Sequence, residues 1–113
     1  MITTAYEVRG ALVTAVASVT NGTTTTLSAG DADYFLDLIE VTFANNSSAA
    51  ASVTLLSDGS TVRTLQIPAN DTVALQFNAP LKQWAKNTNW SVDMADITGT
   101  TISVGATLVK IKQ

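Results

Sequence analysis

The chain of 113 residues contains neither cysteine nor histidine. Without these residues the usual ligand sets for zinc, copper, haem and iron–sulfur clusters cannot be assembled, and neither can a Ser–His–Asp or Cys–His nucleophile system. Disulfide bonds are excluded as well, so packing, hydrogen bonds and contacts between subunits must stabilise the fold. We therefore expect no cofactor and no small-molecule substrate.

Charged side chains are also scarce. They make up 13% of the residues, with six Lys+Arg against nine Asp+Glu and a formal net charge of −3, where an average soluble domain has about 25%. The basic residues are scattered along the chain, as Arg9, Arg63, Lys82, Lys86, Lys110 and Lys112. A negative chain without a basic cluster binds polyanions poorly, so we expect no nucleic-acid partner.

Long apolar runs are missing too. No segment reaches the ~20 residues needed to span a bilayer, so we expect no membrane insertion. The Ala- and Val-rich run 11–19 has the size of the apolar part of a signal peptide. However, Glu7 lies close to Arg9 before it, and Thr14 and Ser18 interrupt it. These polar residues favour a strand.

Turn signals divide the chain into short β-branched and alternating segments. Eight strands are predicted, at 11–20, 23–28, 34–44, 52–57, 61–67, 72–78, 90–94 and 101–112. The dipeptides Asn21-Gly22 and Asp58-Gly59 favour two-residue turns, so 11–28 and 52–67 are each predicted to form a hairpin. The segment around 81–86 has no period of two, and one helical turn fits it.

The number and spacing of these strands predict an all-β fold. Turn signals every 8–12 residues are typical of a sandwich or a barrel. Eight strands and the lengthy 78–90 connection favour a jelly-roll-like antiparallel β-sandwich. We predict a single domain over residues 11–113, preceded by an extended N-terminal arm of residues 1–10.

The strand at 34–44 is apolar on both of its predicted faces. With strict alternation, one face carries Phe35, Ile39, Val41 and Phe43, and the other carries Leu36, Leu38, Glu40 and Thr42. Such a strand is central, or its second face is covered from outside its own sheet. In the last strand, Val109 and Ile111 switch the apolar side, which predicts a bulge at Gly105 or a second burial surface.

The acidic residues show no catalytic pattern. Most of them occupy predicted turns, where Asp caps its own backbone. Asp37 and Glu40 are three positions apart on one predicted strand, so they are expected to project from opposite faces. Asp31-x-Asp33 and the pair at 93 and 96 are fragments of a calcium loop, but neither has the glycines and the closing glutamate of one. We predict neither an enzyme nor a metal site.

Three aromatic residues indicate a possible binding function. Trp84 and Trp90, together with Tyr34, could form a platform for sugar rings, as in carbohydrate-binding modules. Trp90 is in phase with Val92 and Met94, which favours a place in the core. Trp84 lies in the irregular segment, where it either anchors an interface or plugs one end of the sandwich.

Four segments after residue 33 carry a family resemblance. They are YFLDLIEVTFANNSSAA, DGSTVRTLQIPAND, an APL segment that leads to NTNW, and the VKIK near the C-terminus. Together they resemble small β-sandwich proteins that decorate the virions of tailed bacteriophages. The Thr-rich stretch at 11–28 has no counterpart in that family.

The resemblance implies an auxiliary head protein with a jelly-roll-like fold that sits on the capsid lattice and braces it. The implied partners are the major capsid protein and copies of the same chain, as a homotrimer. The implied location is the capsid surface of the virion, after synthesis in the host cytoplasm. The alternative is a carbohydrate-binding module of a phage fibre or receptor-binding protein.

The same hypothesis assigns contact residues. We expect the arm to dock on a neighbouring subunit, and we expect apolar side chains of the domain to meet a neighbour as well. The predicted interface residues are Tyr6, Leu36, Leu38, Trp84, Val109 and Ile111.

Overall fold

The computed structural model describes residues 12–20, 24–83, 85–94 and 101–111, and within them it contains eight strands and no helix. The strands are β1 (Leu12–Thr20), β2 (Thr24–Ser28), β3 (Phe35–Asn45), β4 (Ala51–Ser57), β5 (Ser60–Ile67), β6 (Asp71–Leu81), β7 (Trp90–Met94) and β8 (Thr101–Ile111). The all-β prediction is confirmed. The predicted arm of residues 1–10 lies outside the described residues.

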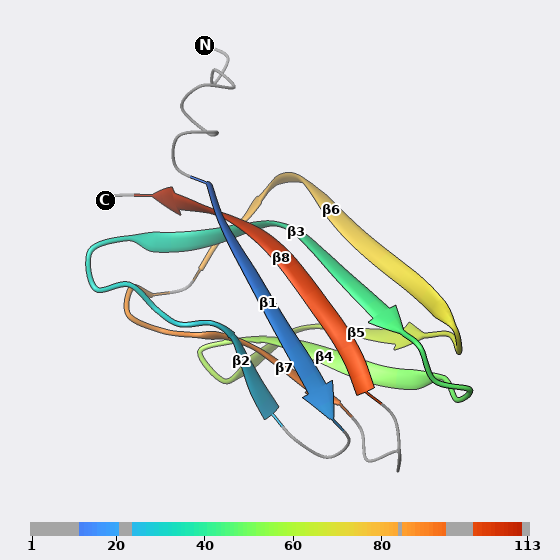
Figure 1. The fold of residues 1–113 in the computed structure, drawn as a ribbon. Coiled ribbons are helices and arrows are strands. Elements are labelled where there is room, and N and C mark those ends of the chain that lie inside the picture. Colours follow the sequence, from blue (N-terminus) through green and yellow to red (C-terminus); the bar gives the residue numbers. More distant parts are fainter. Residues whose placement is uncertain (1–11, 21–23, 84, 95–100, 112–113) are drawn as a thin grey trace.

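The strands form two four-stranded antiparallel sheets, with the orders β1-β8-β3-β6 and β2-β7-β4-β5 (Figure 1). Among the described strands, only β4 and β5 are neighbours both in sequence and in a sheet. Every other connection carries the chain from one sheet to the other. This order is that of a jelly roll, in which two Greek keys wrap into a sandwich, so the jelly-roll prediction is confirmed.

One of the two predicted hairpins forms. β4 and β5 pair across Asp58 and Gly59, whose φ values of 52° and 77° are the positive pair that a type I′ turn requires. The hairpin predicted over 11–28 is wrong, because β1 pairs with β8 and β2 pairs with β7 in the opposite sheet. A turn signal indicates that the chain reverses, but it does not determine which sheet receives the second strand. The Asn21-Gly22 turn itself lies outside the described residues.

A β-bulge in β3 changes which residues face the core. Leu38 pairs with Leu108 and Glu40 pairs with Thr107, so Ile39 is the extra residue between them. The side chains of Leu36 and Leu38 before the bulge, and those of Val41 and Phe43 after it, are all buried. The prediction of two opposed apolar faces is therefore wrong, because strict alternation fails at the bulge.

The bulge also places two acidic residues on one face. Asp37 pairs with Val109 and Glu40 pairs with Thr107, two positions along β8, so both acids belong to the outer side of the sheet. This corrects the expectation that they project from opposite faces. No bulge occurs at Gly105, since the register between β1 and β8 is continuous.

The core lies between the two sheets. Its fully buried side chains include Val19, Phe43, Leu55, Ile67, Trp90, Val92, Met94, Ile102 and Leu108. Burying each large apolar side chain contributes about 1.5–3 kcal/mol to folding. The indole N–H of Trp90 donates a hydrogen bond of 2.6 Å to the carbonyl oxygen of Leu36, so the polar atom of this buried ring has a partner. The predicted core position of Trp90 is confirmed.

Candidate functional site

The predicted interface residues do not form one surface. Leu36 and Leu38 are core side chains, because the bulge in β3 turns them inward. Val109 is buried within the chain as well. All three side chains are thus buried within the single chain, and their contact with a neighbour stays a prediction. Ile111 is half-buried at the end of β8, while Tyr6 and Trp84 lie outside the described residues.

The loop between β6 and β7 is attached to β3 by a buried glutamine. Gln83 is 4% exposed, and its Oε1 accepts the N–H of Leu36 at 2.7 Å. Its Nε2 donates to the carbonyl oxygen of Thr88 at 2.6 Å, and its backbone N–H donates to Oδ1 of Asp37 at 3.0 Å. The described residues of this loop form no helical turn. The network is structural, since each of these polar groups has a partner within the chain.

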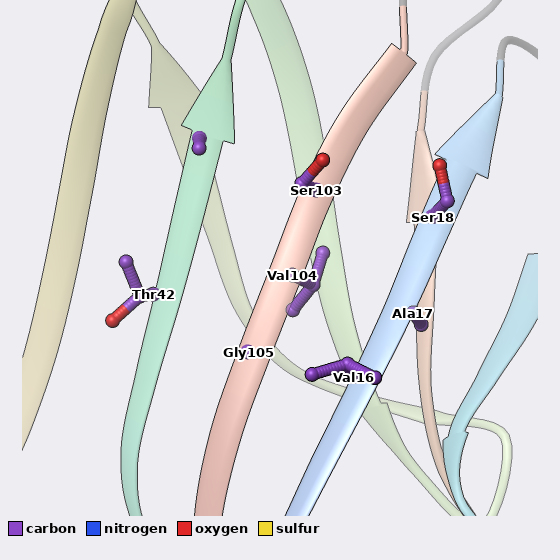
Figure 2. A pocket seen from close by; sticks show the side chains of 8 residues that line it. Val16, Ala17, Ser18, Thr42, Ser103, Val104 and Gly105 are labelled. Atoms are coloured by element: carbon purple, nitrogen blue, oxygen red, sulfur yellow. The ribbon is translucent and has the colours of Figure 1, made fainter.

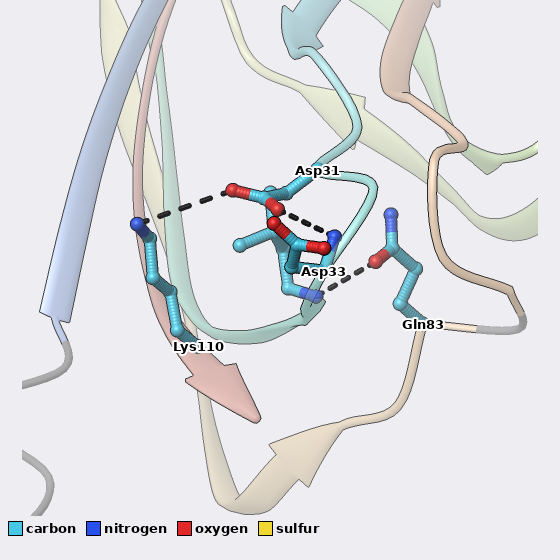
Figure 3. Close-up of polar contacts among 5 residues, drawn as sticks. Asp31, Asp33, Gln83 and Lys110 are labelled. Atoms are coloured by element: carbon cyan, nitrogen blue, oxygen red, sulfur yellow. Dashed lines mark hydrogen bonds and ion pairs between the residues drawn. The ribbon is translucent and has the colours of Figure 1, made fainter. Parts of the chain in front are cut away.

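An ion pair connects the loop before β3 to the end of β8 (Figure 3). The ammonium of Lys110 lies 4.0 Å from Oδ2 of Asp31, and Oδ1 of Asp31 accepts the N–H of Asp33 at 2.8 Å. The same ammonium lies 5.2 Å from the ring centroid of Tyr34. Asp31 therefore caps its own turn and pairs with a lysine.

Within residues 12–20, 24–83, 85–94 and 101–111, no group of three or more His, Cys, Asp or Glu side chains lies close enough together to hold a metal ion. None of the described segments forms a helix that is long and apolar enough to cross a membrane.

The surface that stands out is a patch on the outer side of β1, β8 and β3 in the first sheet. Its residues alternate with the buried ones along each strand and are small and uncharged, whereas Asp37 and Glu40 lie on the same side of β3 outside this patch. We call this surface the Val16 face, and it consists of Thr14, Val16, Ser18, Thr42, Ala44, Ser103, Gly105 and Thr107. Val16 is 83% exposed.

A shallow depression lies within the Val16 face, over Gly105 (Figure 2). Gly105 pairs with Val16 on one side and with Thr42 on the other, so the three residues form one row across three strands. A Cβ built on Gly105 meets no heavy atom within 4 Å. Val16 remains exposed because its cross-strand neighbour has no side chain to pack against it.

Sequence reasoning did not identify Val16. The sequence predicts 11–20 as one arm of a hairpin, and its small alternating residues do not indicate which side of the strand faces outward. The sequence contains one signal for Val16: it is a β-branched apolar residue between the polar residues Thr14 and Ser18 on the same side of the strand.

Comparisons with known proteins give no family. No protein-family model matches the chain, and no curated protein sequence matches it either. Among solved structures, PirA has a TM-score of 0.49 and 11% identity, over 87% of this chain and 93% of its own. The insecticidal delta-endotoxin Cry8Ea1 from Bacillus thuringiensis has a TM-score of 0.45 and 8% identity, over 89% of this chain and 20% of its own.

An enzyme also occurs among these structures. The hydroxypropylphosphonic acid epoxidase from S. wedmorenis has a TM-score of 0.39 and 10% identity, over 85% of this chain and 42% of its own. Structural similarity this weak gives no information about function. The assignment as a jelly roll rests on the strand order of the chain itself.

Proposed function

We propose that the chain is a non-enzymatic structural protein of a bacteriophage virion, a decoration protein that binds the outer surface of the capsid lattice and stabilises it. The sequence resemblance over residues 34–113 motivates this proposal, and the homotrimer that the resemblance implies is part of it. The jelly roll agrees with it at the level of architecture, because viral capsid domains use this fold among other proteins.

The Val16 face is the observation that carries the proposal. A partner that covers it buries no charge, so binding avoids the large desolvation cost of ionised groups. Thr, Ser, Ala and Gly side chains lose little conformational entropy when they become ordered. Val16 supplies an exposed apolar side chain on β1, at one edge of this surface. These properties fit a flat protein surface such as the outside of a capsid shell.

No observation favours the carbohydrate-binding alternative. Trp90 is fully buried, and the ammonium of Lys110 lies near the Tyr34 ring. Two of the three aromatic residues of the predicted platform therefore have other roles in the described part of the chain.

Binding to capsids that were assembled without the protein tests the proposal. Ser103 is exposed on the Val16 face, so Ser103→Lys introduces a charge that a shell surface would have to desolvate. The matched control is Thr64→Lys, on an exposed position of β5 in the other sheet. We expect the purified protein to sediment with the capsids, Ser103→Lys to weaken binding at least about tenfold, which corresponds to about 1.4 kcal/mol, and Thr64→Lys to leave binding unchanged.

Two results would contradict the proposal. If the unmodified protein does not sediment with capsids, the chain is not a decoration protein. If both lysine variants bind as well as the unmodified protein, the Val16 face is not the contact surface.

A further inference from the structure

In the described part of the chain the two sheets have four edge strands, and three of them carry features that prevent pairing with another strand. β2 has only five residues and a register shift within its ladder. β5 carries Arg63 and is paired to β4 through a second register shift. β6 contains Pro80 and breaks its register with β3. Short strands, charges, prolines and bulges are the known means by which proteins protect sheet edges.

β1 is the edge strand without any such protection. Its nine residues contain no charge and no proline, and its register with β8 runs without a break from Leu12 to Thr20. The two large hydrophobic side chains that are exposed in the described residues, Val16 at 83% and Leu12 at 40%, both belong to it. In the described part of the chain no strand pairs with its other edge, since the nearby β2 pairs with β7 in the opposite sheet (Figure 1).

The sequence of β1 reads nearly the same in both directions about Val16. Ala15 corresponds to Ala17, Thr14 to Ser18, and Val13 to Val19. In an antiparallel pair of two such strands, a twofold axis at Val16 places each side chain opposite one of its own kind. A strand that is complementary to itself in this way indicates a second copy of the same chain as its partner.

We infer that β1 is a self-association site, at which two copies of the chain join by antiparallel pairing centred on Val16. Pairing over residues 13–19 forms roughly six to eight hydrogen bonds and merges two four-stranded sheets into one sheet of eight strands. On the inner side, Ala15 and Ala17 are only partly buried against the core of the single chain, and the partner strand covers them. On the outer side, the two Val16 side chains meet at the axis.

This inference does not depend on the proposed function. Capsid binding uses the outer face of the sheet, whereas self-association uses the hydrogen-bonding edge of β1. A twofold contact through β1 is also compatible with a homotrimer. If the trimer forms through another surface, β1 remains available and can join two trimers.

Cross-linking through a single introduced cysteine tests the pairing directly, because the chain has no cysteine of its own. Directly opposite residues of an antiparallel pair have Cβ atoms about 4.5–5.5 Å apart, close to the separation that a disulfide needs. We expect Val16→Cys to give a covalent dimer under mild oxidation. Ala74→Cys, exposed on β6 at the opposite edge of the same sheet, is the control and should remain monomeric on denaturing gels.

Opposite charges at Val16 provide a second test that does not need oxidation. Val16→Lys and Val16→Glu each place like charges face to face, so each alone should weaken self-association about tenfold or more in light scattering. An equimolar mixture of the two variants should restore it, because unlike charges then face each other. Ala74→Lys should leave self-association unchanged.

The outcomes separate the two proposals. An unmodified protein that assembles in even numbers, together with restoration in the mixture, supports pairing through β1. A monomer, or a trimer that Val16→Lys leaves intact, overturns pairing through β1 whatever the capsid experiment shows. Equal cross-linking of Val16→Cys and Ala74→Cys also overturns it, since the contact would then not be specific to β1.

Discussion

Substitution by alanine is expected to change the free energy of unfolding in opposite directions at Gly105 and at Gly30. Gly105 is an extended residue inside β8, and a Cβ added there meets open space. Gly30 precedes β3, and a Cβ added there lies 2.5 Å from the carbonyl carbon of Asn87, 2.6 Å from the carbonyl oxygen of Thr88, and close to the backbone nitrogen of Thr88. All three neighbours at Gly30 are backbone atoms, which cannot move aside as the end of a flexible side chain can.

The magnitudes follow from these surroundings. A glycine within a strand destabilises a protein by roughly 0.5–1 kcal/mol relative to alanine, so Gly105→Ala should raise the free energy of unfolding by that amount. Overpacking costs typically about 1–3 kcal/mol, and Gly30→Ala should lower the free energy of unfolding by about 2 kcal/mol. For a domain of this size, about 4 °C in Tm corresponds to each kcal/mol. We therefore expect Tm to rise by about 2–4 °C for Gly105→Ala and to fall by about 8 °C for Gly30→Ala.

Differential scanning calorimetry and urea unfolding measure both changes, and the unmodified protein is the common reference. A fall in Tm for Gly105→Ala would mean that the depression over this residue is not open. An unchanged Tm for Gly30→Ala would mean that the loops at Gly30 and Thr88 do not pack as closely as the structure shows.

Two buried polar residues give further predictions of opposite sign. Gln83→Leu removes the partners of the Leu36 N–H and the Thr88 carbonyl. Each buried polar group left unpaired costs about 1–3 kcal/mol, so the loss of both partners should lower the free energy of unfolding in urea by about 2–6 kcal/mol. A loss below about 1 kcal/mol would contradict the network. Ser57→Ala should instead stabilise the protein by about 1 kcal/mol. The reason is that the buried Ser57 Oγ has no hydrogen-bond partner in the described part of the chain. A lower free energy of unfolding for this variant in the same assay would refute the prediction.

Most of the secondary structure could be predicted from local patterns. Alternation and turn residues located all eight strands, because a half-buried strand and a tight turn each place direct demands on neighbouring residues. The hairpin at Asp58-Gly59 has the same local origin. The count of strands and the connection predicted at 78–90 were enough to favour a jelly roll over other sandwiches, although β6 continues to Leu81.

The features that could not be predicted depend on distant partners. Nothing within 11–28 distinguishes a reversal inside one sheet from a reversal between two sheets, and the structure shows the second. No local pattern in the sequence indicates the bulge at Ile39, although this bulge determines whether Leu36 and Leu38 face the core or the outside. The exposure of Val16 depends on Gly105, which lies 89 positions further along the chain and becomes its neighbour only when β1 pairs with β8.

Val16 belongs both to the outer face of the sheet and to its edge strand β1, and this double position links the two proposals. Two copies that pair through β1 carry their Val16 faces side by side in one eight-stranded sheet, so a capsid surface meets twice the uncharged area. Two linked contacts bind more tightly than one, because the second forms within a complex that already exists. Val16→Lys should therefore reduce both self-association and capsid binding, whereas Ser103→Lys, on β8 and away from the edge, should reduce capsid binding alone. If Ser103→Lys also separates the copies, edge and face do not act as distinct surfaces, and the contact between copies involves the face of the sheet.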